Sequence, residues 1–293
     1  MSRAAPSISR FVPVLPYLAL AGSMLSFCLG TSLARQLFPA LGAPGTAACR
    51  VGFSALILLA VFRPWRRLPS RADALRVMRY GAVLGLMNLC FYMALRTIPL
   101  GLAIAVEFLG PLTVALLHSR RVAQFALVAM AVAGLALLLP LATHRDALDP
   151  SGFGFALGAG LFWALYILFG QRVGHVPPGV AVSLGMASAA AIVVPIGIAT
   201  SGAALLSPTL MLVGLAAAAL SSSLPYSLEI FALRHIPAQR FGILLSLEPA
   251  LGAITGALLL GEALSPRQWL AIALVMIASA GSVLTGERGA IPA

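Results

Sequence analysis

Charged side chains inside apolar segments are the residues of this sequence that could do chemistry. Arg50 lies within "TAACRVGFSAL", and Glu107 and Glu248 lie seven to eight residues into two long apolar runs. A charge at the centre of a membrane helix costs about 2.5–3.5 kcal/mol on insertion scales, so each needs a partner or a water-filled cavity. A guanidinium can hold a carboxylate through two hydrogen bonds, and a carboxylate can hold an ammonium group or carry a proton. Together these groups suit a zwitterionic ligand.

The charged residues have different expected roles. We expect Arg50 to bind the carboxylate of a substrate, and Glu107 to bind its ammonium group or to couple protons, with Glu248 as the second proton-coupling candidate. Snorkelling or ion pairing is the structural alternative for Arg50, and helix packing is the alternative for Glu248. Glu229 is expected on a solvated face, and Glu262 is expected to fix a helix end.

Uncharged polar residues add further candidates for substrate binding. Two apolar segments carry polar faces, and the candidates on them are Asn88, Tyr92, Ser221, Ser222, Ser223 and Tyr226. Such side chains also bridge helices routinely, which is the alternative for each of them. Trp163 is expected to serve in packing.

Two prolines are expected to kink helices near the middle of the membrane. Pro111 has no N–H, so the carbonyl of Glu107 loses its usual helical partner, and Pro249 does the same to Leu245. The freed carbonyls could serve a ligand or an ion. A kink satisfied by a neighbouring serine or threonine is the alternative.

Other kinds of chemistry lack a sequence pattern. Cys28, Cys49 and Cys90 have no CxxC spacing and the four histidines are scattered, so we expect neither a metal site nor a disulfide framework. Walker loops and a Ser/His/Asp order are also absent from the sequence. We therefore expect no cofactor, no ATP-driven pump and no enzyme.

Composition places the chain in a lipid bilayer. Hydrophobic residues make up 60% of the sequence and charged residues 9%, with a mean hydropathy of +1.01. The net charge of +11 could suggest nucleic acid, but the charges lie between apolar runs, as membrane orientation requires. The first apolar run, 11–29, is longer than the core of a secretory signal, so we expect a retained first span.

Proline, glycine and arginine residues divide the chain into ten expected membrane helices. About 20 apolar residues suffice to cross a bilayer as a helix. The expected ranges are 12–34, 43–62, 77–96, 100–117, 123–141, 151–172, 178–200, 208–233, 240–260 and 267–286.

The arginines predict the orientation of these helices. With the N-terminus inside, fourteen of the 19 basic residues, all arginines, fall at or near cytoplasmic segments, and Arg50 belongs to neither side. The four on the outside are Arg35, Arg96, Arg145 and Arg267. This positive-inside bias predicts that both termini are cytoplasmic.

A repeated phrase divides the chain into two halves. "ALRTIP" at 94–99 returns as "ALRHIP" at 232–237, and the same offset of 138 relates Pro111 to Pro249 and Asn88 to Tyr226. Two five-helix repeats follow, over 1–141 and 142–293. Because five is odd, the second copy is inverted, and inverted repeats can expose a central site to either side in turn. A duplicated scaffold without transport is the alternative.

The chain resembles a known family of transporters. Ten spans, an inverted five-plus-five repeat and the segment "LEPALGAITGALLLGEALSPRQWLAIALVMIASAG" resemble the EamA branch of the drug/metabolite transporter superfamily over nearly the whole chain. Segments such as "PLGLAIAVEFLGPLTVAL" are similar to the amino-acid exporters within it. The resemblance implies a multi-pass protein of the bacterial inner membrane that exports threonine- or homoserine-type amino acids, coupled to proton entry. Export of another metabolite or drug is the alternative, and the oligomeric state stays open.

Overall fold

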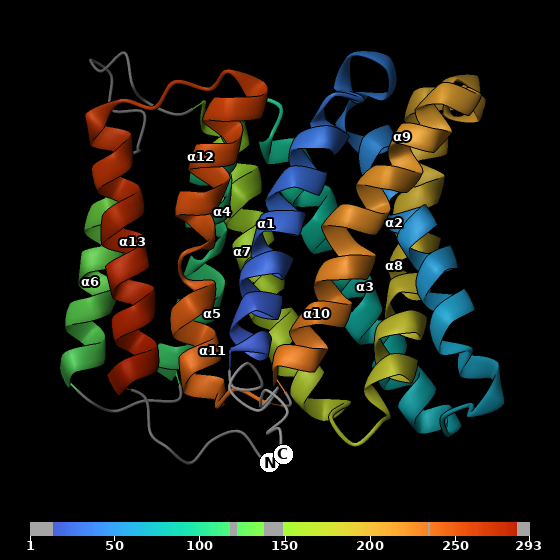
Figure 1. Ribbon diagram of the computed structural model, residues 1–293, viewed down its shortest axis with the longest axis horizontal. Coiled ribbons are helices and arrows are strands. Elements are labelled where there is room, and N and C mark those ends of the chain that lie inside the picture. The colour runs from blue at the N-terminus through green and yellow to red at the C-terminus, as the bar shows by residue number, and fades with distance from the viewer. Residues whose placement is uncertain (1–13, 118–121, 138–148, 234, 286–293) are drawn as a thin grey trace, which may run out of the picture.

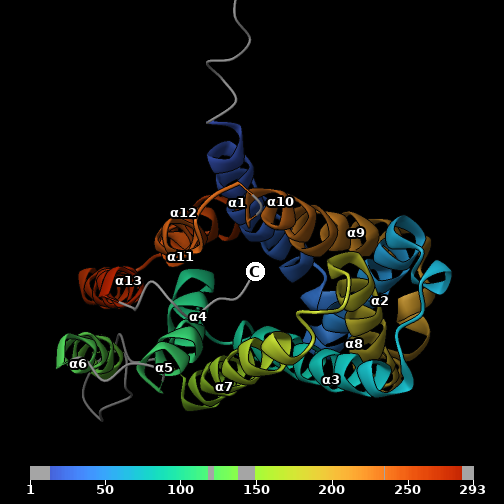
Figure 2. The same cartoon turned by 90° about the horizontal axis from the view of Figure 1, so that it is seen from below.

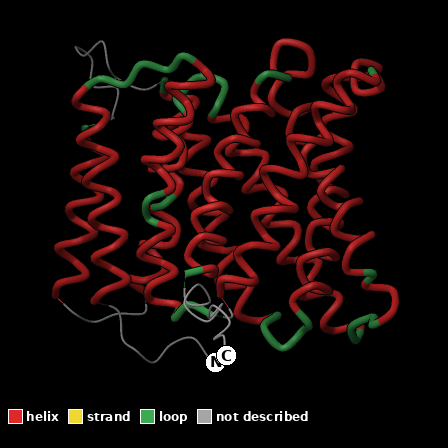
Figure 3. The backbone as a smooth tube through the Cα atoms, in the orientation of Figure 1, coloured by secondary structure: helices red, strands yellow, loops and turns green. Residues whose placement is uncertain are grey.

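The computed structural model describes residues 14–117, 122–137, 149–233 and 235–285. Every regular element in these ranges is a helix (Figure 1, Figure 3). Eight helices are long and apolar enough to cross a membrane, and two shorter apolar stretches are Leu100–Val114 and Phe125–Ala136. The predicted all-helical membrane fold is therefore confirmed. Several predicted features lie outside the described residues. They are the cytoplasmic segment before the first predicted helix, most of the one between the fourth and fifth, the end of the fifth predicted helix, the repeat boundary at 141/142 and the C-terminal tail.

The described part of the first half of the chain contains six α-helices and a 3-10 turn. A Ser70 cap, whose hydroxyl accepts from the N–H of Asp73 at 3.2 Å, starts the third helix six residues before its predicted start. The elements are α1 (Leu15–Arg35), α2 (Phe38–Phe62), η2 (Pro64–Arg66), α3 (Arg71–Ala94), α4 (Leu100–Glu107), α5 (Leu109–Leu117) and α6 (Val122–Ala136).

The second half follows a similar order of helices, except that the counterpart of α3 is interrupted. Its first helix is capped by Asp149, which accepts from the N–H of Gly152 at 3.0 Å. The hydroxyl of Ser151 and this N–H hold the pKa of the Asp149 carboxyl below its usual value. The elements are α7 (Pro150–Arg172), α8 (Pro178–Ser201), η3 (Gly202–Leu206), α9 (Pro208–Ala218), η4 (Ala219–Ser223), α10 (Leu224–Leu233), α11 (Ala238–Leu245), α12 (Glu248–Leu260) and α13 (Pro266–Thr285).

Three predicted helices are interrupted. The fourth predicted helix is divided at Phe108 into α4 and α5, and the ninth is divided at Ser246 and Leu247 into α11 and α12. Both interruptions lie within four residues before a proline, where the missing N–H leaves a carbonyl without its helical partner. The eighth predicted helix contains the π-helical turn η4.

Helices of the two halves pack against each other. α2 packs on α8, α3 on α7 and α8, α1 on α10 and α12, α4 on α7 and α12, and α6 on α13 (Figure 2). Close approach needs small residues: a Cβ added to Gly81 of α3 would lie 2.2 Å from the carbonyl oxygen of Gly185 on α8.

The bundle has two ends that we name by residues. α1 runs from the lower to the upper end of Figure 1, whereas α7 ends at the lower end, next to the connection to α8. The upper end contains Arg35 and Glu262, and we call it the Glu262 end. The lower end contains η2, and we call it the Arg66 end. The described chain begins and finishes at the Arg66 end.

Candidate functional site

A cavity of about 230 Å³ lies between helices of both halves. It is lined by one cation, three carboxyl groups, four other polar side chains, a proline and a set of apolar residues. The charged and polar residues are Arg50, Glu107, Glu229, Glu248, Asn88, Tyr166, Ser221 and Tyr226, and the others are Phe27, Met87, Phe91, Ile104, Trp163, Pro225 and Leu245.

Arg50 is fixed by hydrogen bonds to both halves of the chain. Its Nη1 donates to Oδ1 of Asn88 on α3, its Nε to Oγ of Ser221 at 2.6 Å, and its Nη2 to the backbone oxygen of Ser221 at 2.8 Å. Only 3% of Arg50 is exposed. A guanidinium has five N–H groups, so these bonds leave two for a ligand.

The π-helical turn η4 explains why a backbone oxygen is free for Arg50. Pro225 lies four residues after Ser221 and has no N–H, so the Ser221 carbonyl lacks its usual α-helical donor and accepts from Arg50. The neighbouring carbonyl of Leu220 accepts from the hydroxyl of Ser26 on α1 at 2.6 Å. The wide turn is thus satisfied by side chains of α1 and α2.

Close packing of α1 holds this turn in place. A Cβ added to Gly30 would lie 2.4 Å from the backbone nitrogen of Ser221 and 2.7 Å from the carbonyl carbon of Leu220. Only glycine therefore allows α1 to approach η4 this closely. The position of the Arg50 guanidinium depends on this contact, because Ser221 supplies two of its acceptors.

Aromatic rings surround the same guanidinium. Its central carbon lies 5.5 Å from the ring centre of Tyr92 and 5.8 Å from that of Phe27. These distances are within the range of cation–π attraction. Tyr92 is fully buried and is not among the residues that line the cavity, so it supports Arg50 from behind.

The three carboxyl groups come from three elements. Glu107 ends α4, Glu248 begins α12, and Glu229 lies on α10, where its Oε1 accepts from the Ser23 hydroxyl at 3.4 Å. Within the described ranges, none of the three forms an ion pair. No three His, Cys, Asp or Glu side chains in these ranges are placed to hold a metal ion.

The structure brings most of the candidates predicted from the sequence into one place. Arg50, Glu107, Asn88, Tyr226 and Glu248 all line the cavity, and Pro249 lies directly after Glu248. Pro111 lies in α5, beyond the interruption at Phe108.

Two of the other predicted residues lie elsewhere. Ser222 is buried like Tyr92, but the serine that lines the cavity is Ser221. Trp163, expected in packing, does pack, with its ring edge-to-face on Phe108 at 4.9 Å between ring centres, and it also lines the cavity.

Sequence reasoning missed two residues of the cavity. The expectation of a solvated face for Glu229 was wrong, because this residue lines the cavity beside Tyr226. Tyr166 was not predicted to line the site. Its hydroxyl, three residues after Trp163 in an apolar run, was a signal that could have identified it. Its hydroxyl accepts from that of Tyr80 on α3 at 2.7 Å, and the two rings stack with centres 4.7 Å apart.

An ion pair joins segments of both halves at the Glu262 end of the bundle. Arg35 at the end of α1 pairs with Oε1 of Glu262, which lies between α12 and α13. Oε2 of Glu262 accepts from the backbone N–H of Leu100, the first residue of α4, at 2.9 Å. Glu262 thus fixes a helix end, as expected from the sequence, and it joins α1 and α4 to the second half.

Comparison with known proteins identifies the family. The model of the EamA-like transporter family matches residues 150–284. The threonine/homoserine exporter RhtA of Escherichia coli (strain K12) and that of Salmonella typhimurium (strain LT2) are each 47% identical to this chain over 284 residues, which is 97% of this chain and 96% of each relative. The chain belongs to the EamA-like transporter family. It is therefore a multi-pass protein of the bacterial inner membrane.

The EamA-like fold also has a counterpart of known structure. One crystal structure aligns with 96% of this chain and 98% of its own, with a TM-score of 0.59 and 18% sequence identity. At this identity the likeness shows the fold alone.

Proposed function

We propose that this chain exports small neutral amino acids of the threonine and homoserine type across the inner membrane. The observation that carries the proposal is the cavity in which Arg50, with two N–H groups to spare, faces three carboxyl groups that have no ion-pair partner among the described residues. A zwitterion supplies the complementary charges. The names of the 47% identical relatives support the same class of substrate.

The geometry supports a separate role for each side of the cavity. Arg50 binds the substrate carboxylate, since its hydrogen bonds to Asn88 and Ser221 fix the direction of the remaining N–H groups. Glu107 binds the ammonium group or exchanges protons, and Glu248 and Glu229 are the other carboxyl groups within the same space. Tyr226 and Asn88 offer hydrogen bonds to a side-chain hydroxyl.

The size of the cavity favours a small substrate. Its volume of about 230 Å³ is below the roughly 300–1,000 Å³ of pockets that enclose drug-sized ligands. An amino acid with a short side chain fits this space better than a drug does. Export of a larger metabolite or drug is the alternative. It would be revealed if such a compound competed with threonine or homoserine for transport.

Two inverted repeats of five helices give this site its alternating access. Exchange of each first-half helix for its counterpart in the second half turns the pair α1–α10 into α7–α3, and the pair α1–α12 into α7–α5. Both partners of each exchange pack together in the structure. This exchange symmetry and the opposite directions of α1 and α7 support ten spans, with domains 1–141 and 142–293 and both termini inside.

Proton entry drives the export. Carboxyl groups inside a membrane protein are typical of proton pathways, and Glu107, Glu248 and Glu229 are grouped beside the substrate position. We propose that one of them binds a proton when the substrate leaves, so that the two species alternate in one cavity.

Uptake of radiolabelled threonine or homoserine into inside-out vesicles tests the proposal. We expect uptake that is driven by an imposed proton gradient and is abolished by Arg50→Ala and by Glu107→Gln, at unchanged levels of protein in the membrane. Arg79→Ala is the matched control, because Arg79 is exposed at the start of α3. Normal uptake by both variants of the cavity would remove Arg50 and Glu107 from the site.

A further inference from the structure

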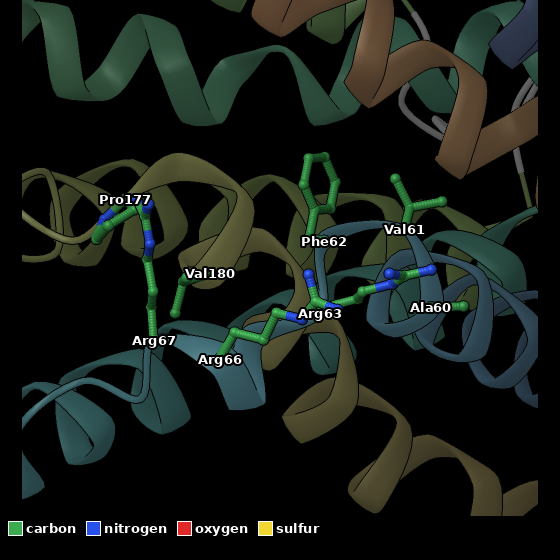
Figure 4. Close-up of a pocket in the computed structure, with 8 residues that line it drawn as sticks. All are labelled: Ala60, Val61, Phe62, Arg63, Arg66, Arg67, Pro177 and Val180. Carbon is green, nitrogen blue, oxygen red and sulfur yellow. The ribbon is translucent and has the colours of Figure 1, made fainter.

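A second, basic pocket lies at the Arg66 end, outside the transport cavity (Figure 4). It has a volume of about 700 Å³ and lies between the end of α2, the turn η2 and the start of α8. Its lining includes Phe62, Arg63, Arg66, Arg67, Pro177 and Val180. Figure 4 shows the three arginine side chains spread along the connection after α2, with Arg67 extending toward Pro177.

The charge of this pocket is not neutralised by the protein. No carboxyl group lines it, and Arg63, Arg66 and Arg67 form no ion pair within the described part of the chain. The acidic residue that follows them, Asp73, accepts from Arg76 at 2.7 Å and lies 2.8 Å from Nε2 of His175. Three guanidinium groups within five residues therefore remain for an external anion, and arginine forks match the oxygens of a phosphate.

The backbone at Arg63, the first arginine of the pocket, has a strained left-handed conformation. Arg63 has φ 46° and ψ 57°, and it is the one non-glycine residue with a positive φ in the described ranges. The left-handed conformation costs a side-chain-bearing residue about 1–2 kcal/mol, and glycine is the usual residue after a helix end. Such strain is common where a residue serves a ligand, and a glycine at this position would supply no guanidinium.

Apolar side chains beside the arginines distinguish a lipid from a free anion. Val61, Trp65 and Leu68 are 63%, 58% and 72% exposed. Tryptophan is enriched where the hydrocarbon of a bilayer meets its headgroups. A lipid whose phosphate binds the arginines can place its acyl chains on these exposed side chains, whereas a free phosphate makes no contact with them.

We propose that Arg63, Arg66 and Arg67 bind the headgroup phosphate of an anionic phospholipid of the cytoplasmic leaflet. A positively charged group in the lipid headgroup would be repelled by the three arginines. An anionic lipid such as phosphatidylglycerol is therefore favoured. The bound headgroup ties the connection after α2 to the start of α8, which joins the two halves of the chain at the Arg66 end. This site is independent of the transported substrate.

Thermal unfolding of the purified full-length protein tests the proposal, with native mass spectrometry to count bound lipids. Phosphatidylglycerol is expected to raise the unfolding midpoint by about 2–4 °C or more over phosphatidylcholine, with at least one retained lipid. Inorganic phosphate is the third arm. An equal rise with inorganic phosphate would overturn the assignment to a lipid, and no difference between the two lipids would overturn the site.

Matched variants separate the pocket from surface charge in general. Arg66→Gln/Arg67→Gln is expected to lose most of the rise produced by phosphatidylglycerol, whereas Arg71→Gln/Arg79→Gln removes the same charge from the exposed face of α3 and keeps the rise. Equal losses in both would show a non-specific surface effect and refute the pocket. Arg63→Gly is expected to raise the midpoint in phosphatidylcholine, by relieving the strained backbone, and yet to reduce the rise given by phosphatidylglycerol.

Discussion

Arg35 and Glu262 form an ion pair across 227 residues of sequence, between the end of α1 and the connection that follows α12. The same carboxylate accepts from the first N–H of α4. One acidic side chain therefore holds three segments together at the Glu262 end.

The ion pair should be measurable as a coupling energy. Arg35→Gln and Glu262→Gln are each expected to lower the free energy of unfolding, and in a double-mutant cycle their effects should differ from additivity by about 0.5–3 kcal/mol, since the side chains are in contact. The cycle is measured by reversible unfolding in mild detergent. Arg79→Gln combined with Glu262→Gln is the additive control, and additivity in both cycles would show that Arg35 and Glu262 are not coupled.

The bonds made by Arg50 predict a response to a conservative change. Arg50→Lys keeps the charge but cannot bond Asn88, the Ser221 hydroxyl and the Ser221 backbone oxygen together. Loss of a hydrogen bond to a charged group costs about 1.5–3 kcal/mol, so we expect transport to fall by a factor of about 10 or more. Substrate uptake at saturating and at low concentration provides the measurement, and a lysine variant with normal uptake would refute the role of this geometry.

Proton coupling can be assigned to one of three carboxyl groups. In Glu107→Gln, Glu229→Gln and Glu248→Gln vesicles, the variant that lacks the coupling group should lose uptake driven by a proton gradient but keep exchange of labelled for unlabelled substrate. A variant that loses both activities has lost substrate binding instead. Full gradient-driven uptake in all three variants would exclude these carboxyl groups as the proton carriers.

Gly30 should be far less tolerant of a methyl group than another helical glycine. Gly30→Ala places a Cβ against the backbone of Leu220 and Ser221, and overpacking of this kind costs about 1–3 kcal/mol. Gly154→Ala is the matched control, because a Cβ there has nothing within 4 Å and alanine favours the helix by about 0.5–1 kcal/mol. Thermal unfolding compares the two, and equal midpoints would contradict the close approach of α1 to η4.

Pro225→Ala should separate stability from transport. Alanine restores an N–H that competes for the Ser221 oxygen, so the helix should become more stable while Arg50 loses an acceptor. We expect a higher unfolding midpoint together with slower uptake of the amino acid. A variant that transports at the normal rate would show that the freed carbonyl is dispensable.

Much of the helix order could be predicted from the sequence, because the bilayer requires apolar runs that proline, glycine and arginine bound. Arg50, Glu107 and Glu248 could be selected because a charge inside such a run needs a reason. Helix ends were less predictable: α2 begins at Phe38 through a break at Gly42, whose φ is 64°, and a pattern of hydropathy does not report such a turn.

The contents of the cavity could be predicted only in part. The sequence does not tell which of the consecutive serines 221–223 faces the cavity, because a π-helical turn inserts an extra residue and rotates the following face, and the structure presents Ser221 there. Glu229 was misplaced because its distance from the expected helix end suggested solvent, whereas α10 turns it toward the cavity. Tyr92 illustrates a further limit, since polarity alone does not say which side of a guanidinium a ring will occupy.

Proline at position 225 has a mechanical consequence. Pro225 has no N–H to compete for the Ser221 oxygen, so the hydrogen bond from Arg50 to that oxygen can persist through the whole transport cycle. We therefore expect α2 and residues 219–233 to move together as one rigid body. Bending is then expected at the two helix interruptions, at Phe108 and at Ser246 and Leu247. Each interruption is directly adjacent in sequence to a glutamate that lines the cavity. Bending and the exchange of charge would thereby occur at the same points of the chain.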